Sequence, residues 1–280
     1  MCMTLVKKKY LKKAIGYIIL LSIFFNHKTP LASENFLLLQ TTTSLRDSGF
    51  LEYIIPKFNE FNHTQIRYVA AGTGKALTNA KNCDADLLIV HSKPDEIEFI
   101  NNNYGKTRKT LMYNNFVLVA PKSNPANIFL NDDIIVAFTK IANTKSKFLT
   151  RSDSSGTYKA ETKIWEMTGI NPILSSGDWY LESGLGMGFT LNIAINLDAY
   201  VLSDNATWLQ FNNKYNHHVI PIKDTHLLNI YSIVTINHQK CPNTKKDLAN
   251  IFSNWLLSED GQDAINAFTV QDQQLFYTFE

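Results

Sequence analysis

Three segments of the chain follow one order: an apolar stretch, a cluster of Thr, Ser and Gly, and then a helical pattern. They are FLLLQTTTSLRDSGFLEYIIPKF (36–58), IRYVAAGTGKALTNAK (66–81) and FLTRSDSSGTYKAETKIWEM (148–167). Each predicts a helix that begins among hydroxyl side chains, and the unpaired N–H groups of a helix start carry partial positive charge. The repeated pattern therefore predicts three helix N-termini that converge on one bound oxyanion.

The first 33 residues have the pattern of a secretory signal peptide. A lysine-rich start is followed by an apolar run from Ala14 to Phe25, and a short polar stretch then reaches Ala32 and Ser33. This run is much shorter than the roughly 20 residues that a membrane-spanning helix needs. We therefore predict a cleaved signal peptide over 1–33 and a periplasmic protein, with an uncleaved membrane anchor as the alternative.

Removal of this leader would leave a mildly acidic protein. The whole chain has 27 Lys and Arg against 25 Asp and Glu, and the leader holds six of the lysines and no acid. The remaining 21 basic side chains against 25 acidic ones give a net charge near −4. Such a protein has no general basic field to attract nucleic acid or anionic lipid, so an anion has to be bound by local geometry.

The order of predicted strands and helices indicates an α/β fold with two lobes. Strands and helices alternate between residues 36 and 102, which favours a largely parallel sheet. The strand pattern FVLVAP (116–121) leads into a second region, and NIYSIVTIN (229–237) would return the chain to the first. We predict lobe 1 over 34–121 and 230–280, lobe 2 over 122–229, and a ligand in the cleft between them.

The first lobe is expected to supply neutral hydrogen-bond donors. Thr42, Thr43 and Ser44 end a predicted buried strand, before a helix expected from Asp47 and Ser48, and Thr73 lies in a glycine-flanked turn. Hydroxyl groups can turn a donor toward an oxygen on any side of an anion. For each loop taken alone, ordinary helix capping or a tight turn without a ligand is the alternative.

The segment TRSDSSGT is expected to supply the positive charge. Arg151 has a planar fork of donors that stays protonated, and Ser155, Gly156 and Thr157 begin a predicted helix beside it. Asp153 in the same segment would repel a dianion. We therefore expect Asp153 to cap the helix or to hold Arg151 in place.

Nothing in the sequence predicts a cofactor or a metal site. At the loop AAGTGKAL, a nucleotide-binding loop would need Gly at the position of Val69, just before the loop, and Ser or Thr at the position of Ala76. His91 has no second histidine at the spacing of metal ligands. Cys83 and Cys241, the cysteines beyond the leader, match no zinc or redox motif. One disulfide and two free thiols both remain open for this pair.

Together and in this order, several segments resemble periplasmic tungstate-binding proteins of ABC importers. They are TTTS with DSGFL, AAGTGKAL, DADLLIVH, YNNFVLVAPK, TRSDSSGTYKAE, WYLESGLGMG and TLNIA. The resemblance implies a type II periplasmic-binding-protein fold, with two α/β lobes joined by a two-strand hinge. It also implies a monomer that captures tungstate without catalysis, cofactor or direct metal ligation and delivers it to a membrane permease with its ATPase.

Two departures from the family pattern bear on the ligand. The family usually shows SRGDDSGT where this chain has TRSDSSGT, so the loop gains hydroxyls and loses an acid. Anion binding is expected to persist, but the choice between tungstate and molybdate stays open. Arg46 stands where small or polar residues are common and would add positive charge at the cleft edge.

Two other functions were weighed against a tungstate receptor. A receptor for molybdate or another oxyanion belongs to the same class of protein. A secreted hydrolase that uses Ser44 or Ser155 belongs to a different class, and it is disfavoured because the chain has no G-x-S-x-G motif and no histidine placed by motif as its base.

Overall fold

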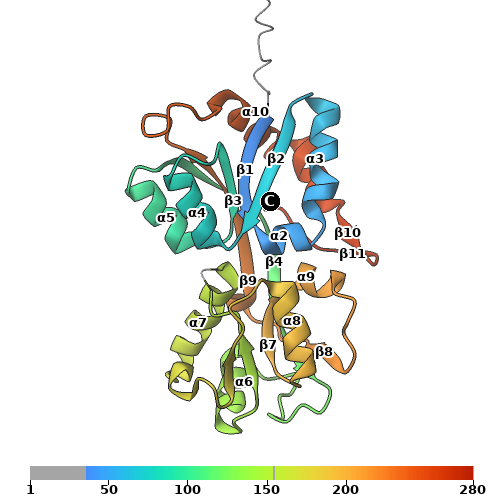
Figure 1. Ribbon diagram of the computed structural model, residues 1–280. Helices are drawn as coiled ribbons and strands as arrows, with labels where there is room; N and C mark the ends of the chain where they lie inside the picture. The colour runs from blue at the N-terminus through green and yellow to red at the C-terminus, as the bar shows by residue number, and fades with distance from the viewer. Residues whose placement is uncertain (1–35, 154, 280) are drawn as a thin grey trace, which may run out of the picture. The chain divides into compact units, whose positions relative to one another are not determined.

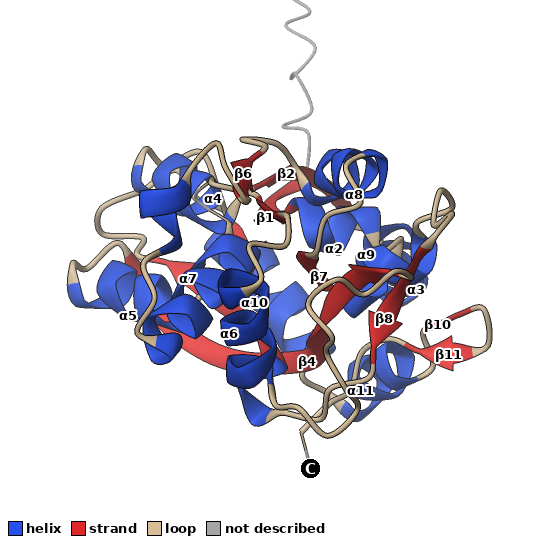
Figure 2. Cartoon of the chain, turned by 90° about the horizontal axis from the view of Figure 1, so that it is seen from below, coloured by secondary structure: helices blue, strands red, loops and turns tan. Residues whose placement is uncertain are grey.

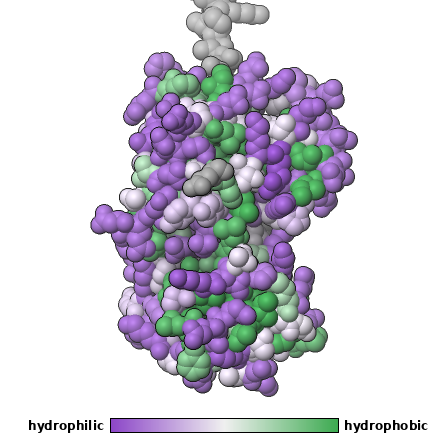
Figure 3. Space-filling view, turned by 180° about the vertical axis from the view of Figure 1, so that it is seen from behind, coloured by the Kyte–Doolittle hydropathy of each residue, from purple (hydrophilic) through white to green (hydrophobic). Residues whose placement is uncertain are grey.

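The computed structural model describes residues 36–153 and 155–279, and the predicted signal peptide lies outside them. Phe36–Glu280 forms one compact unit. Within the described residues, no helix has the length and apolar character needed to cross a membrane. Hydrophilic residues cover most of the face seen in Figure 3, with smaller hydrophobic patches between them.

The main sheet has seven strands in the order β2-β1-β3-β9-β4-β7, with β8 paired to β4. Its strands are β1 (Phe36–Thr42), β2 (Gln65–Ala71), β3 (Leu87–Val90), β4 (Gly105–Pro121), β7 (Val201–Asp204), β8 (His217–Ile220) and β9 (Leu228–Ile236). β1 is parallel to β2 and β3, whereas β9 is antiparallel to β3 and β4, and β4 is antiparallel to β7 and β8. The sheet is therefore mixed. The expectation of a largely parallel sheet is wrong beyond β1, β2 and β3, because β4 and β9 run past each other in opposite directions.

Helices flank the strands on both sides (Figure 2). They are α2 (Thr43–Asp47), α3 (Phe50–Phe61), α4 (Thr73–Lys81), α5 (Lys93–Asn101), α6 (Ile134–Asn143), α7 (Gly156–Thr168), α8 (Met187–Asn196), α9 (Asn205–Gln210), α10 (Lys246–Leu256) and α11 (Glu259–Asn266). Short pieces complete the chain: β5 (Phe148–Thr150), β6 (Tyr180–Glu182), β10 (Thr269–Val270), β11 (Gln273–Gln274) and the 3₁₀ turns η1 (Pro172–Ser175) and η2 (Thr225–Leu227). Several helices begin at side-chain caps, such as Asp133 before α6 and Ser258 before α11, which accept a backbone N–H of the first turn.

Buried side chains form separate hydrophobic cores, and β4 and β9 pass between them (Figure 1). β4 contributes Leu111 and Met112 to one core and Phe116 to the other. Tyr231 of β9 belongs to the first core, and Leu227, just before β9, belongs to the second. The chain thus passes from one of these cores to the other along each of the two paired strands.

The short helix α9 contacts both cores. Its Ala206 and Leu209 pack in the first core, while Trp208 packs beside α8 in a cluster of the second region. The side chain of Gln210 donates to the backbone oxygen of Ser48, at 3.1 Å. α9 therefore joins the two regions at a second place, apart from β4 and β9.

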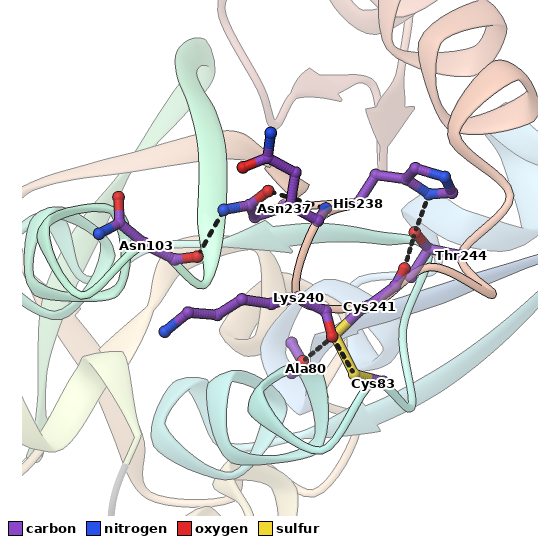
Figure 4. Close-up of a disulfide and its surroundings, with 9 residues drawn as sticks. Ala80, Cys83, Asn103, Asn237, His238, Lys240, Cys241 and Thr244 are labelled. Carbon is purple, nitrogen blue, oxygen red and sulfur yellow. Dashed lines mark hydrogen bonds between the residues drawn. A yellow bond between two sulfur atoms is a disulfide. The ribbon is translucent and has the colours of Figure 1, made fainter.

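Cys83 and Cys241 form a disulfide, which resolves the alternative left open by the sequence (Figure 4). Cys83 lies just after the C-terminal end of α4, and Cys241 lies in the loop between β9 and α10. Their Cα atoms are 5.3 Å apart across a sequence separation of 158 residues. The disulfide links the N-terminal and C-terminal parts of the chain that together form the first region.

Candidate anion-binding site

The first two hydroxyl clusters lie at one edge of the sheet. β1 and β2 are parallel and in register, with Thr42 opposite Ala71, so the segments that follow them emerge side by side. Thr43 and Ser44 follow β1, and Thr73 follows β2. Because β3 is also parallel to β1, the residue after its end, His91, emerges at this same edge.

The TTTS cluster has a different local structure from the one predicted. α2 begins at Thr43, and Thr42 is its N-cap, whose hydroxyl oxygen accepts the N–H of Leu45 at 3.3 Å. The helix predicted after Asp47 and Ser48 is α3 (Phe50–Phe61), and the short helix α2 before it was not predicted, because the cap at Thr42 supports a helical turn directly after the strand. As a result, Thr43 and Ser44 lie in the first turn of a short helix.

The second cluster forms the start of α4, as predicted, although the helix begins two residues earlier than expected. Gly72 is the N-cap, in an extended conformation with φ −66° and ψ 151°, and Thr73 is the first helical residue. Thr73 is fully buried. Its hydroxyl is thus held at the N-terminus of a nine-residue helix.

The third cluster begins α7, and Asp153 holds Arg151, which is one of the two roles expected of it. One carboxylate oxygen of Asp153 accepts Nη2 of Arg151 at 2.6 Å, and the other accepts the backbone N–H of Ser155 at 3.0 Å. Ser155 is the N-cap of α7, and its hydroxyl oxygen accepts the N–H of Tyr158 at 3.1 Å. Arg151 is only 2% exposed, so the pairing with Asp153 fixes a buried guanidinium.

Most of the predicted ligand side chains have buried polar atoms without a partner among the described residues. These atoms are Thr43 Oγ1, Ser44 Oγ, Thr73 Oγ1, Thr157 Oγ1, and Nε and Nη1 of Arg151. A buried donor without a partner costs about 1–3 kcal/mol, and more if it is charged, so such groups are rare without a functional reason. All of them can donate a hydrogen bond, which is the donor set that an oxyanion requires. The residues present therefore fit a bound oxyanion.

The remaining three predicted residues contribute differently. The hydroxyl oxygens of Thr42 and Ser155 accept capping bonds, but each hydroxyl keeps its hydrogen to donate. Gly156 is buried at the first position of α7. A Cβ built at Gly156 would lie 2.6 Å from Cε1 of His91, so close packing alone requires a glycine here.

His91 is a neighbour of the site that sequence reasoning set aside as a loop residue. Its Nδ1 lies 2.8 Å from Oδ1 of Asn229, and its ring stacks on Tyr231 with centroids 4.7 Å apart. Since Nδ2 of Asn229 donates to Asn114, the hydrogen-bond network assigns the proton of His91 to Nδ1. Burial, with a smaller contribution from Arg151, lowers the pKa of His91 to about 4, so the ring is neutral at pH 7.

Two buried acids also lie near the site. Asp204, the N-cap of α9, accepts the N–H and the hydroxyl of Thr207, and burial raises its pKa. Arg151 and the Ser44 hydroxyl lie close enough to Asp204 to offset part of this increase in its pKa. Ser44 Oγ nevertheless forms no hydrogen bond with Asp204 or with any other described residue. Asp204 therefore brings an acceptor near a set of donors, and no sequence motif pointed to it.

Glu161 lies in α7, behind the loop that carries Arg151. It accepts hydrogen bonds from the Thr150 hydroxyl at 2.8 Å, the Tyr180 hydroxyl at 2.8 Å and Nε1 of Trp165 at 3.2 Å. Burial raises the pKa of Glu161 to about 8, which leaves the carboxyl group mostly protonated at pH 7. This acid therefore anchors the loop without adding a full negative charge near Arg151.

Arg46 lies at the margin of the site. Its guanidinium pairs with the neighbouring Asp47 at 2.6 Å and is 46% exposed. Arg46 and Thr43 line a pocket of about 440 Å³ together with Gly186 and Gly188 of the glycine-rich turn. Arg46 thus adds charge at an opening beside Thr43, and much of that charge is offset by Asp47. Over residues 36–153 and 155–279, no group of three or more His, Cys, Asp or Glu side chains is placed to hold a metal ion.

Comparison with known proteins gives a consistent picture. Residues 27–260 match the model of the PBP superfamily domain. The chain is 40% identical over 234 residues to the tungstate-binding protein TupA of Peptoclostridium acidaminophilum, covering 83% of this chain and 81% of that protein. The solved tungstate-binding protein TupA from Desulfovibrio alaskensis G20 is 34% identical with a TM-score of 0.75, covering 87% of this chain and 98% of that one. A structure described as the tungstate ABC transporter from Geobacter sulfurreducens is 33% identical with a TM-score of 0.76, covering 84% and 99%.

Proposed function

Because this chain belongs to the PBP superfamily and has the type II periplasmic-binding-protein fold of its relatives, we propose that it captures tungstate and delivers it to an ABC importer. Its partners would be a membrane permease and the ATPase of that importer. The observation that carries the proposal is the set of buried donors without partners at three helix starts. The relatives named for tungstate then identify the anion.

In this proposal, the anion is bound by Thr42, Thr43, Ser44 and Thr73 from one side and by Arg151, Ser155, Gly156 and Thr157 from the other. The hydroxyls and the N-termini of α4 and α7 would donate to the oxygens of the dianion. Arg151 would supply the countercharge, held at the correct angle by Asp153. Gly156 would offer its backbone N–H, since the first N–H groups of a helix have no partner within it.

The donor chemistry also favours one class of oxyanion over another. Hydrogen phosphate would direct its O–H at a donor and leave an unpaired proton, whereas tungstate and molybdate are fully deprotonated dianions at neutral pH. Sites that require a hydrogen-bond partner discriminate strongly against ligands that cannot pair with it. Phosphate is therefore expected to bind poorly. Tungstate and molybdate have the same charge and shape, so donor chemistry separates them only weakly.

The two hydrophobic cores support a two-lobed organisation with the anion between the lobes. We place the first crossing within β4, between Met112 and Phe116, which is earlier than the boundary at Pro121 favoured by the strand pattern. The second crossing falls near residue 230, at the start of β9. Closure of the lobes about these two strands would bury the anion and give the permease a state to recognise.

We propose that the protein acts in the periplasm, in agreement with the ABC-transporter relatives and with the predicted signal peptide over residues 1–33, and that it acts as a monomer. N-terminal sequencing of the secreted protein would detect cleavage near residue 33, and an intact N-terminus in the membrane fraction would contradict it. No catalysis is proposed. Among the described residues, neither Ser44 nor Ser155 has a hydrogen bond to a histidine, which a serine hydrolase would need.

The proposal is tested by equilibrium dialysis against a mixture of tungstate, molybdate, sulfate and phosphate, followed by elemental analysis of the protein. About one tungsten atom per chain, with little phosphorus or sulfur, is the expected result. Molybdenum at an equal level would make the protein a receptor for both group 6 oxyanions. Retention of none of the four elements would contradict the proposal.

A further inference from the structure

The N-terminal turns of α7 contact the segment that follows β3, across the boundary between the two cores. Lys159 of α7 reaches Asp95 of α5, and its Nζ lies 2.5 Å from both carboxylate oxygens. Ile164 and Trp165 place α7 in the second core. Helix α5 packs through Phe99 on a cluster of the first region. The ion pair therefore links two regions that are otherwise connected mainly through β4, β9 and α9.

A second contact lies one helical turn earlier on the same helix. Gly156 stands three residues before Lys159, so the two residues share a face of α7. A Cβ at Gly156 would meet Cε1 and Nδ1 of His91 at 2.6 Å and the backbone oxygen of His91 at 2.9 Å. Only a residue without a side chain allows α7 to approach the end of β3 this closely.

The side of this contact that carries Asp95 is held in place within its own region. The Ser92 hydroxyl donates to Asp95 at 2.6 Å, and the backbone N–H of Ser92 donates to Glu96 at 2.7 Å. Glu96 is fully buried and pairs with Arg108 of β4 at 2.7 Å. The carboxylate that receives Lys159 is therefore presented by a fixed helix start.

From these contacts we propose that the Lys159–Asp95 pair and the Gly156–His91 packing form a latch that holds the two lobes closed over the anion. The inference rests on the proposed function, because it assigns the latch to retention of the bound anion. Lys159 and Asp95 are positioning residues: they act by holding α7, which begins with the proposed ligands Gly156 and Thr157. Their contribution is mainly to the rate of release, because the ion pair has to break before the lobes reopen and the anion leaves.

The size of the effect follows from exposure. The side chains of Lys159 and Asp95 are 40% and 21% exposed, and ion pairs of this kind contribute modestly and are screened by salt. Replacing one charge by its opposite also adds repulsion. We therefore expect each reversal, Lys159→Asp or Asp95→Lys, to speed tungstate dissociation about 5-fold and to change association by less than about 2-fold.

The test is a charge-swap cycle on the purified protein, with stopped-flow tryptophan fluorescence to measure tungstate association and dissociation. Each single reversal should speed dissociation, and the double variant Lys159→Asp/Asp95→Lys should return the rate to within about 2-fold of the wild type. Lys163→Asp is the matched control, since Lys163 lies one turn further along α7 and lines the same pocket as Lys159 without an ion pair among the described residues. Failure of the double variant to restore the rate, or equal effects of the control, would overturn the latch.

A second measurement makes no use of the anion. Small-angle X-ray scattering of the anion-free protein should give a larger radius of gyration for each single reversal than for the wild type and the double variant. Equal radii for all four proteins would overturn the latch even if tungstate does not bind. Absence of tungstate binding by the wild type, with the expected ranking of radii, would instead contradict the proposed function and leave the latch supported.

Discussion

The two sides of the candidate site bring different chemistry to one anion. Beside β1 and β2, the buried donors are neutral hydroxyls of Thr43, Ser44 and Thr73. On the opposite side, α7 begins next to Arg151, whose guanidinium is held by Asp153, and the neighbouring Thr150 is held by the buried acid Glu161. The first side can adjust its donors by rotating hydroxyls, whereas the second presents a rigid fork.

This difference affects how each side treats a protonated anion. The charge of Arg151 attracts any small dianion from a fixed position, and its N–H groups can only donate, so they penalise an oxygen that carries a proton. A hydroxyl can rotate to donate or to accept, so the neutral side tolerates such an oxygen. The following predictions test this division, and they begin with the charged side.

Arg151→Ala should cause the largest loss of tungstate binding. Removal of one partner of a buried, hydrogen-bonded charge pair costs about 2–5 kcal/mol, which is a loss of roughly 30-fold to more than 1,000-fold in affinity. Isothermal titration of the variant measures the loss. Arg46→Ala is the matched control, because Arg46 is exposed and already paired with Asp47, and its loss should stay below about 5-fold. Equal losses for the two variants would show that Arg151 does not supply the main countercharge of the anion.

The disulfide should stabilise the first region without affecting the site. The variant Cys83→Ser/Cys241→Ser should lose about 2–5 kcal/mol of unfolding free energy in a urea titration, because the bond closes a loop of 158 residues in sequence separation. Cys83 follows the C-terminal end of α4, whereas Thr73 begins that helix, so tungstate affinity should change by less than about 2-fold. A large loss of affinity in a folded variant would show that the two ends of α4 are coupled.

Glu161 should make the stability of the second region fall as the pH rises. The folded-state pKa of about 8 lies above the ordinary value of 4.5, so the folded protein binds more protons between these values. The stabilisation is fully present below about pH 4.5 and is lost as the pH rises through about 8, by about 3–5 kcal/mol at most. Thermal unfolding at pH 5 and pH 8.5 measures the loss, which Glu161→Gln should abolish. Glu166→Gln, an exposed change on the same helix, should leave the pH dependence as in the wild type.

Single hydroxyl deletions on the neutral side should have smaller effects on affinity. Ser44→Ala and Thr73→Ala should each weaken tungstate binding by about 1–2 kcal/mol, or roughly 5- to 30-fold, because one donor is removed from the charged ligand. Thr78→Ala is the control in the same helix as Thr73, since the Thr78 hydroxyl bonds to the Gly74 oxygen on an exposed face. Because a hydroxyl can also accept a hydrogen bond, neither deletion should improve phosphate binding relative to tungstate. A relative gain in phosphate affinity would show that these hydroxyls are held as donors only.

The parts of the fold that depend on local sequence patterns were predictable. Apolar runs such as LLIV and the hydroxyl-rich helix starts identified β3, α4 and α7 near their observed positions. Strand direction was not predictable, because the pairing of β9 with both β3 and β4 joins residues far apart in the chain. β4 was predicted only over residues 116–121. Its first half, with exposed polar residues between Gly105 and Thr110, has little apolar signal of its own.

In the candidate site, too, only the residues in a local sequence pattern could be predicted. Residues in clustered motifs, such as Arg151 and Thr73, could be proposed because their neighbours point to a helix start. His91 ends the segment DADLLIVH and Asp204 ends an apolar strand, and neither pattern gives a role to the side chain, so only the folded structure reveals that His91 lies against Gly156 and Asp204 lies near Arg151. Glu161 resembles any acid on an amphipathic helix, and its burial depends on the packing of Tyr180 and Trp165 around it.

The most direct test of the central claim is isothermal titration of residues 34–280 with tungstate, molybdate, sulfate and phosphate in separate experiments. The account predicts one site per chain, tight binding of tungstate, and far weaker binding of phosphate. Molybdate binding indicates how much selectivity remains in the serine-rich loop at residues 150–157. Absence of heat with all four anions, or preference for phosphate, would contradict the claim that these buried donors form a site for a fully deprotonated oxyanion.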